Sequence, residues 1–261
     1  MSKDQLGEIN MRIVGVIPAR FKSTRLDGKP LMDILGKPMI QHVYERARRS
    51  QRLSDVLVAT DDERIQKAVE GIGGKVIMTS PQHKTGTDRV AEAVGHLNVD
   101  IVVNIQGDEP LMDPIMIDEC ISPFNSSPNV QIATVIKRLS DESTYSDPAV
   151  VKTVRDSSGR ALYFSRSLIP FPRSRTKDFA VYEHVGIYAY TKDCLLKLSS
   201  LPPTTLEMIE DLEQLRALEH GIPIHLVETQ RHCELVSVDT AADLEKVRQI
   251  MAASQEERNA Q

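Results

Sequence analysis

A cationic loop follows the first apolar run of the chain. Residues 18–30 contain Arg20, Lys22, Arg25 and Lys29, four cations within ten residues, together with hydroxyl side chains and a glycine. Guanidinium and ammonium groups bind phosphate oxygens, and a glycine lets the backbone approach an anion closely. The spacings of a P-loop and of the GxGxxG fingerprint are both missing. The loop is either a solvated basic segment or a triphosphate-binding loop, and its place directly after the first expected strand favours the second.

An acidic turn follows another apolar run. Residues 102–110 end in Gln-Gly-Asp-Glu-Pro, so Asp108 stands at the expected end of a strand, where its carboxylate could hold a divalent metal and Gln106 could orient a polar ligand. Glu109 is expected to turn away, because Pro110 forces a bend. A plain acidic turn explains the same residues equally well. However, a nucleoside triphosphate with its magnesium ion needs both cations and a carboxylate, so the two segments together favour a nucleotidyltransferase.

Three further polar segments admit both a functional and a structural interpretation. Residues 85–89 open an expected helix and could meet a base or a sugar, although an ordinary helix N-terminus is the simpler explanation. Asp239 precedes the last expected helix, and capping is the default role of an Asp there, with metal binding as the alternative. Glu210, Glu213 and Gln214 have the spacing of one helix side, where they could receive sugar hydroxyls or face solvent.

The composition narrows the class of protein. The 261 residues are 41% hydrophobic but only 4% aromatic with no Trp, so the core is aliphatic and base stacking on aromatic side chains is not expected. The formal net charge of -5 argues against a protein that coats nucleic acid. The three cysteines are far apart, which argues against disulfides and zinc and suits a reducing cytoplasm. We expect no signal peptide and no membrane span, since no apolar run approaches about 20 residues.

Apolar runs rich in β-branched residues alternate with helical patterns in the first half of the chain. We expect strands at 12–17, 55–59, 75–78 and 100–105, and helices at 38–50, 62–71 and 87–97. This alternation predicts an α/β fold with a mostly parallel central sheet flanked by helices. Such sheets bind ligands at the carboxyl ends of their strands, and the loops 18–30, 60–62 and 106–110 all fall at that edge.

The second half has a different pattern. We expect strands at 131–137, 149–155, 160–164, 186–190 and 224–227, a hairpin turn at 157–160, an irregular arm at 170–177, one helix at 205–220 and a final helix at 240–253. Either Asp239 or Thr240 is the expected N-cap of that final helix. No linker divides the chain, so we expect a single domain over 11–253 with flexible ends at 1–10 and 254–261.

These motifs together resemble the 3-deoxy-manno-octulosonate cytidylyltransferase family, also called CMP-Kdo synthetases. The matching segments are 17–20, 23–26, 28–31, 59–61, 86–89, 104–110, 161–166, 184–188, 206–207, 213–216 and 238–240. They follow the order of the family from about residue 11 to residue 250, and their combination is far more specific than the first two alone. Asp27 departs from the usual Pro of the family and would leave the loop beside Lys29 more mobile. Thr85 replaces a more usual Ser and keeps its hydroxyl.

The resemblance implies a fold and an activity. The fold would be a nucleotide-diphospho-sugar transferase fold of the glycosyltransferase-A type, with a smaller dimerisation sub-sheet and a homodimer whose interface includes an arm at about 160–190. The enzyme would use CTP and Mg2+ to activate the sugar acid Kdo as CMP-Kdo for lipopolysaccharide biosynthesis in the cytoplasm. One alternative is a related cytidylyltransferase for 8-amino-Kdo or sialic acid. A non-catalytic nucleotide sensor is another, against which the intact carboxylates and cations argue.

The resemblance also implies roles for individual residues. Arg20 and Lys29 would bind the triphosphate, and Asp108 and Asp239 would hold magnesium, which replaces capping as the expectation for Asp239. Four residues, Thr85, Gly86, Thr87 and Arg89, would belong to the cytidine pocket. The sugar-acid site would consist of Gln106, Arg166, His184, Tyr188, Glu213 and Gln214, and further substrate contacts would come from Ala19, Ser23 and Thr60.

Overall fold

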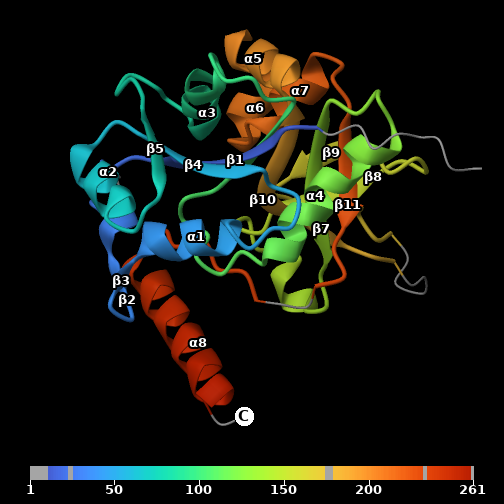
Figure 1. The fold of residues 1–261 in the computed structure, drawn as a ribbon. Helices are drawn as coiled ribbons and strands as arrows, with labels where there is room; N and C mark the ends of the chain where they lie inside the picture. Colours follow the sequence, from blue (N-terminus) through green and yellow to red (C-terminus); the bar gives the residue numbers. More distant parts are fainter. Residues whose placement is uncertain (1–10, 23–25, 174–178, 232–233, 260–261) are drawn as a thin grey trace, which may run out of the picture.

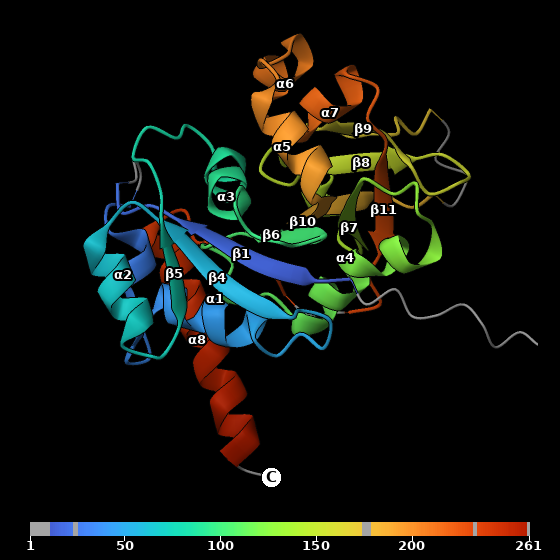
Figure 2. The ribbon, with the colours of Figure 1, turned by 45° about the horizontal axis from the view of Figure 1, so that its top comes forward.

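A twisted central sheet runs through the molecule and carries helices on both faces (Figure 1). The computed structural model describes residues 11–22, 26–173, 179–231 and 234–259. Helices α1 and α4 pack on one face of the sheet, and α3 and α5 pack on the other. Figure 2 shows α3, α5, α6 and α7 on the same side of the sheet, away from α1 and α8. Both faces are covered, which explains why β1 and β4 carry buried apolar residues on both sides of the sheet.

The strands follow the order β11-β7-β10-β6-β1-β4-β5 across the sheet. Strand β1 pairs in parallel with β4 and β6, and further parallel pairs join β4 to β5 and β7 to β11, whereas β10 runs antiparallel between β6 and β7. The mostly parallel sheet is therefore confirmed. The strands are β1 (Ile13–Ala19), β4 (Asp55–Thr60), β5 (Lys75–Met78), β6 (Ile101–Ile105), β7 (Ile132–Arg138), β8 (Lys152–Arg155), β9 (Ala161–Ser165), β10 (Tyr182–Thr191) and β11 (Ile224–Glu228), with β2 (Asp33–Ile34) and β3 (Lys37–Pro38) as a separate antiparallel pair.

The helices expected in the first half are all present. The helices are α1 (Met39–Ala47), α2 (Glu63–Glu70), α3 (Gly86–Val94), α4 (Pro114–Ser126), α5 (Lys192–Ser200), α6 (Thr205–Glu210), α7 (Gln214–Glu219) and α8 (Ala241–Asn259), with 3-10 turns η1 (Lys29–Leu31) and η2 (Glu142–Thr144). The sequence patterns did not reveal α4 and α5. Both begin at clear caps, since Asp113 accepts a hydrogen bond from the N–H of Ile115 and Thr191 accepts one from the N–H of Cys194.

The single helix expected at 205–220 is wrong. Helix α6 ends at Glu210, because the next residue, Asp211, has a φ of 51° and a ψ of 50° in the left-handed region, and α7 begins at Gln214. A buried ion pair between Glu207 and Arg216 joins the two short helices across this break. Because the chain turns there, Glu210 and Glu213 do not share one helix side.

The chain ends differ from the expectation as well. Helix α8 continues to Asn259, past the predicted end at residue 253, and projects away from the body of the molecule (Figure 1). Residues 1–10 and 260–261 lie outside the described residues. The hairpin expected at 157–160 joins β8 and β9, which extend the sheet beside β10. Within the described residues, every helix is too short or too polar to cross a membrane.

Candidate active site

The loops that follow β1 and β6 lie against each other. The two strands are parallel neighbours, so their carboxyl ends meet at one edge of the sheet. Gly107 makes the approach possible, because a Cβ atom at this position would lie 2.7 Å from the carbonyl oxygen of Pro18. The cationic loop and the acidic turn are therefore brought together by the sheet itself.

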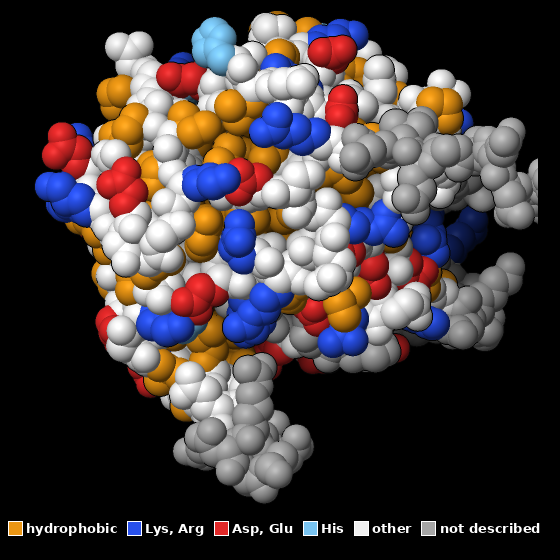
Figure 3. Space-filling model, in the orientation of Figure 1, with side chains coloured by type: hydrophobic (Ala, Val, Ile, Leu, Met, Phe, Trp, Pro, Cys, Tyr) orange, Lys and Arg blue, Asp and Glu red, His pale blue; other side chains and the backbone are white. Residues whose placement is uncertain are grey.

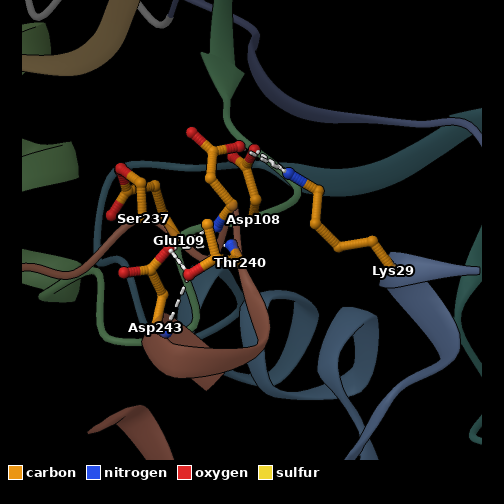
Figure 4. Close-up of polar contacts among 7 residues, drawn as sticks. Lys29, Asp108, Glu109, Ser237, Thr240 and Asp243 are labelled. Carbon is orange, nitrogen blue, oxygen red and sulfur yellow. Dashed lines mark hydrogen bonds and ion pairs between the residues drawn. The ribbon is translucent and has the colours of Figure 1, made fainter. Parts of the chain in front are cut away.

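A single ammonium group joins the two predicted metal carboxylates. Lys29 lies in the 3-10 turn η1, and its Nζ is 2.7 Å from Oδ2 of Asp108 and 3.2 Å from Oδ1 of Asp239. Figure 4 shows the Lys29 side chain reaching across to Asp108. The backbone N–H of Val238 also donates to the carbonyl oxygen of Asp108 at 2.9 Å, which fixes the segment before α8 against the acidic turn.

Thr240, rather than Asp239, caps helix α8. The Thr240 hydroxyl accepts a hydrogen bond from the N–H of Asp243, and Oδ2 of Asp243 accepts hydrogen bonds from the N–H groups of Thr240 and Asp239 (Figure 4). This reciprocal arrangement is a capping box, which satisfies N–H groups that a helix start leaves unpaired. The Asp239 carboxylate consequently does not cap the helix and pairs with Lys29 beside Asp108.

These carboxylates open onto a cleft of about 230 Å³. Among the residues predicted as site residues, the lining includes Ala19, Arg20, Lys29, Thr85, Gly86, Arg89, Gln106, Asp108 and Asp239. The cleft also contains His83, Lys84 and Met39, which sequence reasoning missed. The signal that could have identified Lys84 is its position directly before the Thr-Gly-Thr-Asp-Arg segment, where another cation suits a phosphate-binding cleft.

The start of helix α3 forms one wall of the cleft. Thr85 caps the helix by accepting a hydrogen bond from the N–H of Asp88 at 3.1 Å, so the structural interpretation of this segment is confirmed, while Gly86 still lines the cleft. Arg89 is buried and donates to Thr79 at 2.6 Å while lying 3.4 Å from Asp61. These partners hold its guanidinium in place.

A second polar cluster lies behind the wall formed by α3. Oε2 of Glu213 accepts a hydrogen bond of 2.7 Å from Thr87, which follows Gly86 of the cleft. Three buried atoms, the Tyr188 hydroxyl, Oε1 of Glu213 and Nε2 of Gln214, have no hydrogen-bond partner among the described residues. Burial raises the pKa of Glu213. Oε1 of Glu213 does lie 3.8 Å from Nη2 of Arg216, in an ion pair. Buried polar groups without hydrogen bonds cost free energy, so the Tyr188 hydroxyl and Nε2 of Gln214 favour a polar ligand as the missing partner.

His184 packs against Tyr188, with ring centroids 5.2 Å apart. Strand β10 is irregular between Val185 and Tyr188, and such bulges re-aim side chains near sites. The Thr134 hydroxyl lies 3.0 Å from Nε2 of His184 and donates to the carbonyl oxygen of Ile187, so Nε2 carries the proton. Burial lowers the pKa of His184 to about 3, which keeps the ring neutral.

The remaining predicted site residues lie elsewhere. Arg166 donates to the backbone carbonyl oxygens of Glu210, Asp211 and Pro148, beside β9 and α6. Thr60 is buried at the end of β4, where its hydroxyl accepts a hydrogen bond from the N–H of Asp62. Ser23 lies outside the described residues. The structure therefore brings the residues predicted to bind phosphate and metal together at the cleft. The predicted site residues in the described part of the chain that do not line it are Thr60, Thr87, Arg166, His184, Tyr188, Glu213 and Gln214.

Glu109 points away from the cleft, as its neighbour Pro110 predicts. It is buried, with 7% of its surface exposed, and its Oε1 accepts a hydrogen bond from the Ser237 hydroxyl. Burial is the main cause that raises its pKa to about 7, the Ser237 hydrogen bond lowers it, and repulsion from Asp108 and other nearby carboxylates raises it further.

The two facing carboxylates fit a magnesium ion. The Lys29 ammonium forms ion pairs with both carboxylates, so the space between them favours a positive charge. Within the described residues, no group of three or more His, Cys, Asp or Glu side chains is arranged to hold a metal. Magnesium needs no such group, because it binds through one or two carboxylates and takes its other ligands from substrate phosphates and water.

Comparisons with known proteins agree with this geometry. The family model described as cytidylyltransferase matches residues 14–235. A 3-deoxy-manno-octulosonate cytidylyltransferase from Geobacter sulfurreducens is 52% identical over 247 residues, covering 91% of this chain and 98% of the relative. The corresponding protein from Solibacter usitatus is 50% identical over 243 residues, covering 93% of this chain and 96% of the relative.

Solved structures of cytidylyltransferases also match this chain. The structure of CMP:2-keto-3-deoxy-manno-octonic acid synthetase complexed with CTP matches with a TM-score of 0.88 and 45% sequence identity, covering 93% of this chain and 99% of that chain. A 4-diphosphocytidyl-2C-methyl-D-erythritol synthase from Anaerococcus prevotii matches with a TM-score of 0.61 at 12% identity, covering 93% of this chain and 97% of that chain, which shows a shared fold.

Proposed function

The chain belongs to the 3-deoxy-manno-octulosonate cytidylyltransferase family, and on that premise we propose the reaction that it catalyses and the residues that carry it out. The enzyme activates the sugar acid Kdo with CTP. The anomeric hydroxyl of Kdo attacks the α-phosphorus of CTP in line, a new phosphorus–oxygen bond forms, and the bond to the β-phosphate oxygen breaks. CMP-Kdo and pyrophosphate are the products, and the hydroxyl proton passes to solvent or to a phosphate oxygen.

The observation that supports this most is the convergence of Asp108 and Asp239 on one cation at the cleft. These two carboxylates would hold Mg2+, which when bound supplies positive charge to the phosphate oxygens and aligns the reacting groups. Arg20 lines the same cleft and, with Lys29, stabilises the negative charge on the departing pyrophosphate.

The nucleoside and the sugar acid would occupy opposite sides of the start of α3. Gly86 and Thr85 line the cleft, where backbone N–H groups at a helix start suit polar groups of the cytidine. The sugar acid would supply hydrogen-bond partners to the Tyr188 hydroxyl, Oε1 of Glu213 and Nε2 of Gln214, three buried atoms that lack one among the described residues. The relatives from Geobacter sulfurreducens and Solibacter usitatus are both named 3-deoxy-manno-octulosonate cytidylyltransferases, so 8-amino-Kdo and sialic acid are kept only for the substrate panel below.

We extend the proposal to a homodimer. Large apolar side chains are exposed on β9, on α6 and on the arm that follows β9, at Leu162 (60%), Met208 (66%), Ile209 (74%) and Phe171 (81%). The Ser165 hydroxyl on β9 donates to Glu210 on α6, so β9 and α6 lie side by side. Neighbouring exposed apolar side chains mark interaction surfaces. We place the protein in the cytoplasm, as the source of activated sugar for lipopolysaccharide biosynthesis.

Nucleic acid is not among the proposed partners. On the face seen in Figure 3, Lys and Arg side chains are interspersed with Asp and Glu side chains. A protein that tracks nucleic acid instead gathers its cations into a patch or stripe.

The test is pyrophosphate release with CTP, Mg2+ and a panel of Kdo, 8-amino-Kdo and sialic acid. We expect turnover with Kdo, and a loss of about 100-fold or more for Asp108→Asn at saturating Mg2+. Asp141→Asn, which changes an exposed Asp at the start of η2, is the matched control and should retain wild-type turnover. Near-full turnover of Asp108→Asn at saturating Mg2+ would contradict the assigned role.

A further inference from the structure

The segment that carries Asp239 is anchored in the core by Val236 and Val238, which are buried in one cluster with Leu111 and Leu244. Residues between β11 and α8 adopt no regular secondary structure in the described part of the chain. Among the described residues, its hydrogen bonds to the acidic turn are the backbone bond from Val238 to Asp108 and the side-chain bond from Ser237 to Glu109. One backbone and one side-chain hydrogen bond thus join the segment that carries Asp239 to the turn that carries Asp108.

Glu109 is an unusual residue for a purely structural link. Its side chain is buried, and its second oxygen, Oε2, has no hydrogen-bond partner among the described residues. A buried carboxyl group with an unpaired oxygen destabilises a fold relative to an apolar side chain of the same shape. Stability alone therefore does not explain a glutamate at this position, and an effect on its neighbours does.

The geometry connects Glu109 to both carboxylates of the cleft. Glu109 follows Asp108 directly, and Ser237 stands two residues before Asp239. Figure 4 shows Glu109 between Asp108 and Ser237, while Thr240 and Asp243 hold the other end of the segment through the capping box. A shift of Ser237 would therefore move Asp239 relative to Asp108.

We propose that Glu109 is a positioning residue, which accepts the hydrogen bond of Ser237 and thereby holds Asp239 at the separation from Asp108 that one divalent ion requires. The inference rests on the proposed metal role of these two aspartates. Neither Glu109 nor Ser237 lines the cleft, so the pair acts through the aspartates rather than on the substrate. Outer partners of metal ligands act in this way, and their loss typically costs about 10- to 100-fold in metal affinity or activity.

The test measures the affinity of the full-length protein for Mn2+, a spectroscopically visible substitute for Mg2+, by electron paramagnetic resonance titration without substrate. Ser237→Ala removes the donor at an exposed residue and leaves no cavity, and Glu109→Leu removes the acceptor while filling the buried space. Glu109→Gln keeps an oxygen that can accept the Ser237 hydrogen bond. Ser50→Ala, which loses a hydroxyl-to-carboxylate bond to Asp118 far from the cleft, is the matched control.

We expect Ser237→Ala and Glu109→Leu each to weaken Mn2+ binding about 10-fold or more, and Glu109→Gln and Ser50→Ala to stay within about threefold of the wild type. The double variant Ser237→Ala with Glu109→Leu should bind Mn2+ no more weakly than the single variant with the lower Mn2+ affinity, because both substitutions remove the same hydrogen bond. The Mg2+ concentration for half-maximal turnover should rise by a similar factor, whereas kcat at saturating Mg2+ recovers.

Several outcomes would overturn the proposal. Unchanged Mn2+ affinity in Ser237→Ala, alongside a clear loss in Asp239→Asn, would overturn the positioning role alone. A loss in Glu109→Gln as large as in Glu109→Leu would show that the charge of Glu109 acts rather than its hydrogen bond, and would also overturn it. Unchanged affinity in Asp239→Asn would remove the metal site on which the inference rests. The proposed reaction fails separately, if the wild type binds Mn2+ but releases no pyrophosphate from CTP and any sugar acid.

Discussion

The side-chain nitrogen of Lys29 lies 2.7 Å from Oδ2 of Asp108, so a cation expected to bind phosphate is paired with a carboxylate expected to bind metal. The same nitrogen lies 3.2 Å from Asp239, and only 15% of the Lys29 side chain is exposed. The ammonium therefore neutralises two carboxylates that would otherwise repel each other. To reach a phosphate, Lys29 has to leave this pair, and a metal ion that binds the carboxylates would favour its departure.

This arrangement predicts opposite effects of Lys29→Met on metal and on catalysis. Without CTP, Mn2+ should bind about 10-fold more tightly than to the wild type, because it no longer competes with the ammonium for the two carboxylates. With CTP and Kdo, turnover should fall about 100-fold, since a cation that stabilises the leaving pyrophosphate is missing. Mn2+ titration by electron paramagnetic resonance and a pyrophosphate assay measure the two effects.

The control for this experiment is Lys37→Met. Lys37 is also paired with a carboxylate, Glu45, but lies outside the cleft. Lys37→Met should change neither the Mn2+ affinity nor the turnover with CTP and Kdo. Equal or weaker Mn2+ binding by Lys29→Met would contradict the competition between the ammonium and the metal.

The sugar-acid cluster yields a second prediction. Tyr188→Phe and Gln214→Leu should each raise KM for Kdo by about 10-fold or more, because each removes a buried group that we expect to hydrogen-bond the sugar. KM for CTP should stay within about twofold. Steady-state kinetics with each substrate varied in turn provides the measurement.

Tyr182→Phe is the control for Tyr188, as Tyr182 lies on the same strand and its hydroxyl accepts a hydrogen bond from Arg155. Equal rises in KM for both substrates would argue that the cluster only supports the fold.

The position of the cleft was predictable from the sequence, because the order of strands in a parallel sheet determines which loops meet. Lys29 and Asp108 follow apolar runs, and parallel neighbouring strands bring the ends of such runs to one edge. Asp239 was not predictable from spacing alone, since capping is the ordinary role of an Asp before a helix. The family resemblance predicts a metal role for it, and the structure shows that Thr240 and Asp243 form the cap instead.

The errors have local causes. Helix α4 begins at Pro114 and contains Pro123, and prolines in a sequence are typical of turns, so the pattern did not indicate a helix. The continuous pattern over 205–220 was misleading for the opposite reason, because a tertiary contact ends α6. The buried pair of Glu207 and Arg216 folds α7 back on α6, and that contact has no periodic signal.

The proposed dimer is tested by a charge on its exposed apolar surface. Ile209→Asp should shift the protein from dimer to monomer in light scattering coupled to size-exclusion chromatography, because a buried unpaired charge in an interface is strongly unfavourable. Ile115→Asp, at an exposed position on α4, is the control and should stay dimeric. A monomeric wild type, or a dimeric Ile209→Asp variant, would contradict this interface.

The last prediction concerns pH and depends on His184. Burial lowers the pKa of His184 from an ordinary value near 6.5 to about 3, so the folded protein keeps this ring neutral where the unfolded chain binds a proton. Its contribution to stability is therefore complete above pH 6.5 and decreases as the pH falls toward 3. Between pH 7.5 and pH 5, the free energy of unfolding should fall by about 2 kcal/mol more in the wild type than in His184→Asn, which cannot titrate.

Denaturant unfolding at the two pH values measures this difference, and His220→Asn, at an exposed histidine, should behave like the wild type. An equal fall in the wild type and His184→Asn would mean that His184 gains its proton in the folded state as readily as in the unfolded chain, which its burial against Phe164 and Tyr188 argues against.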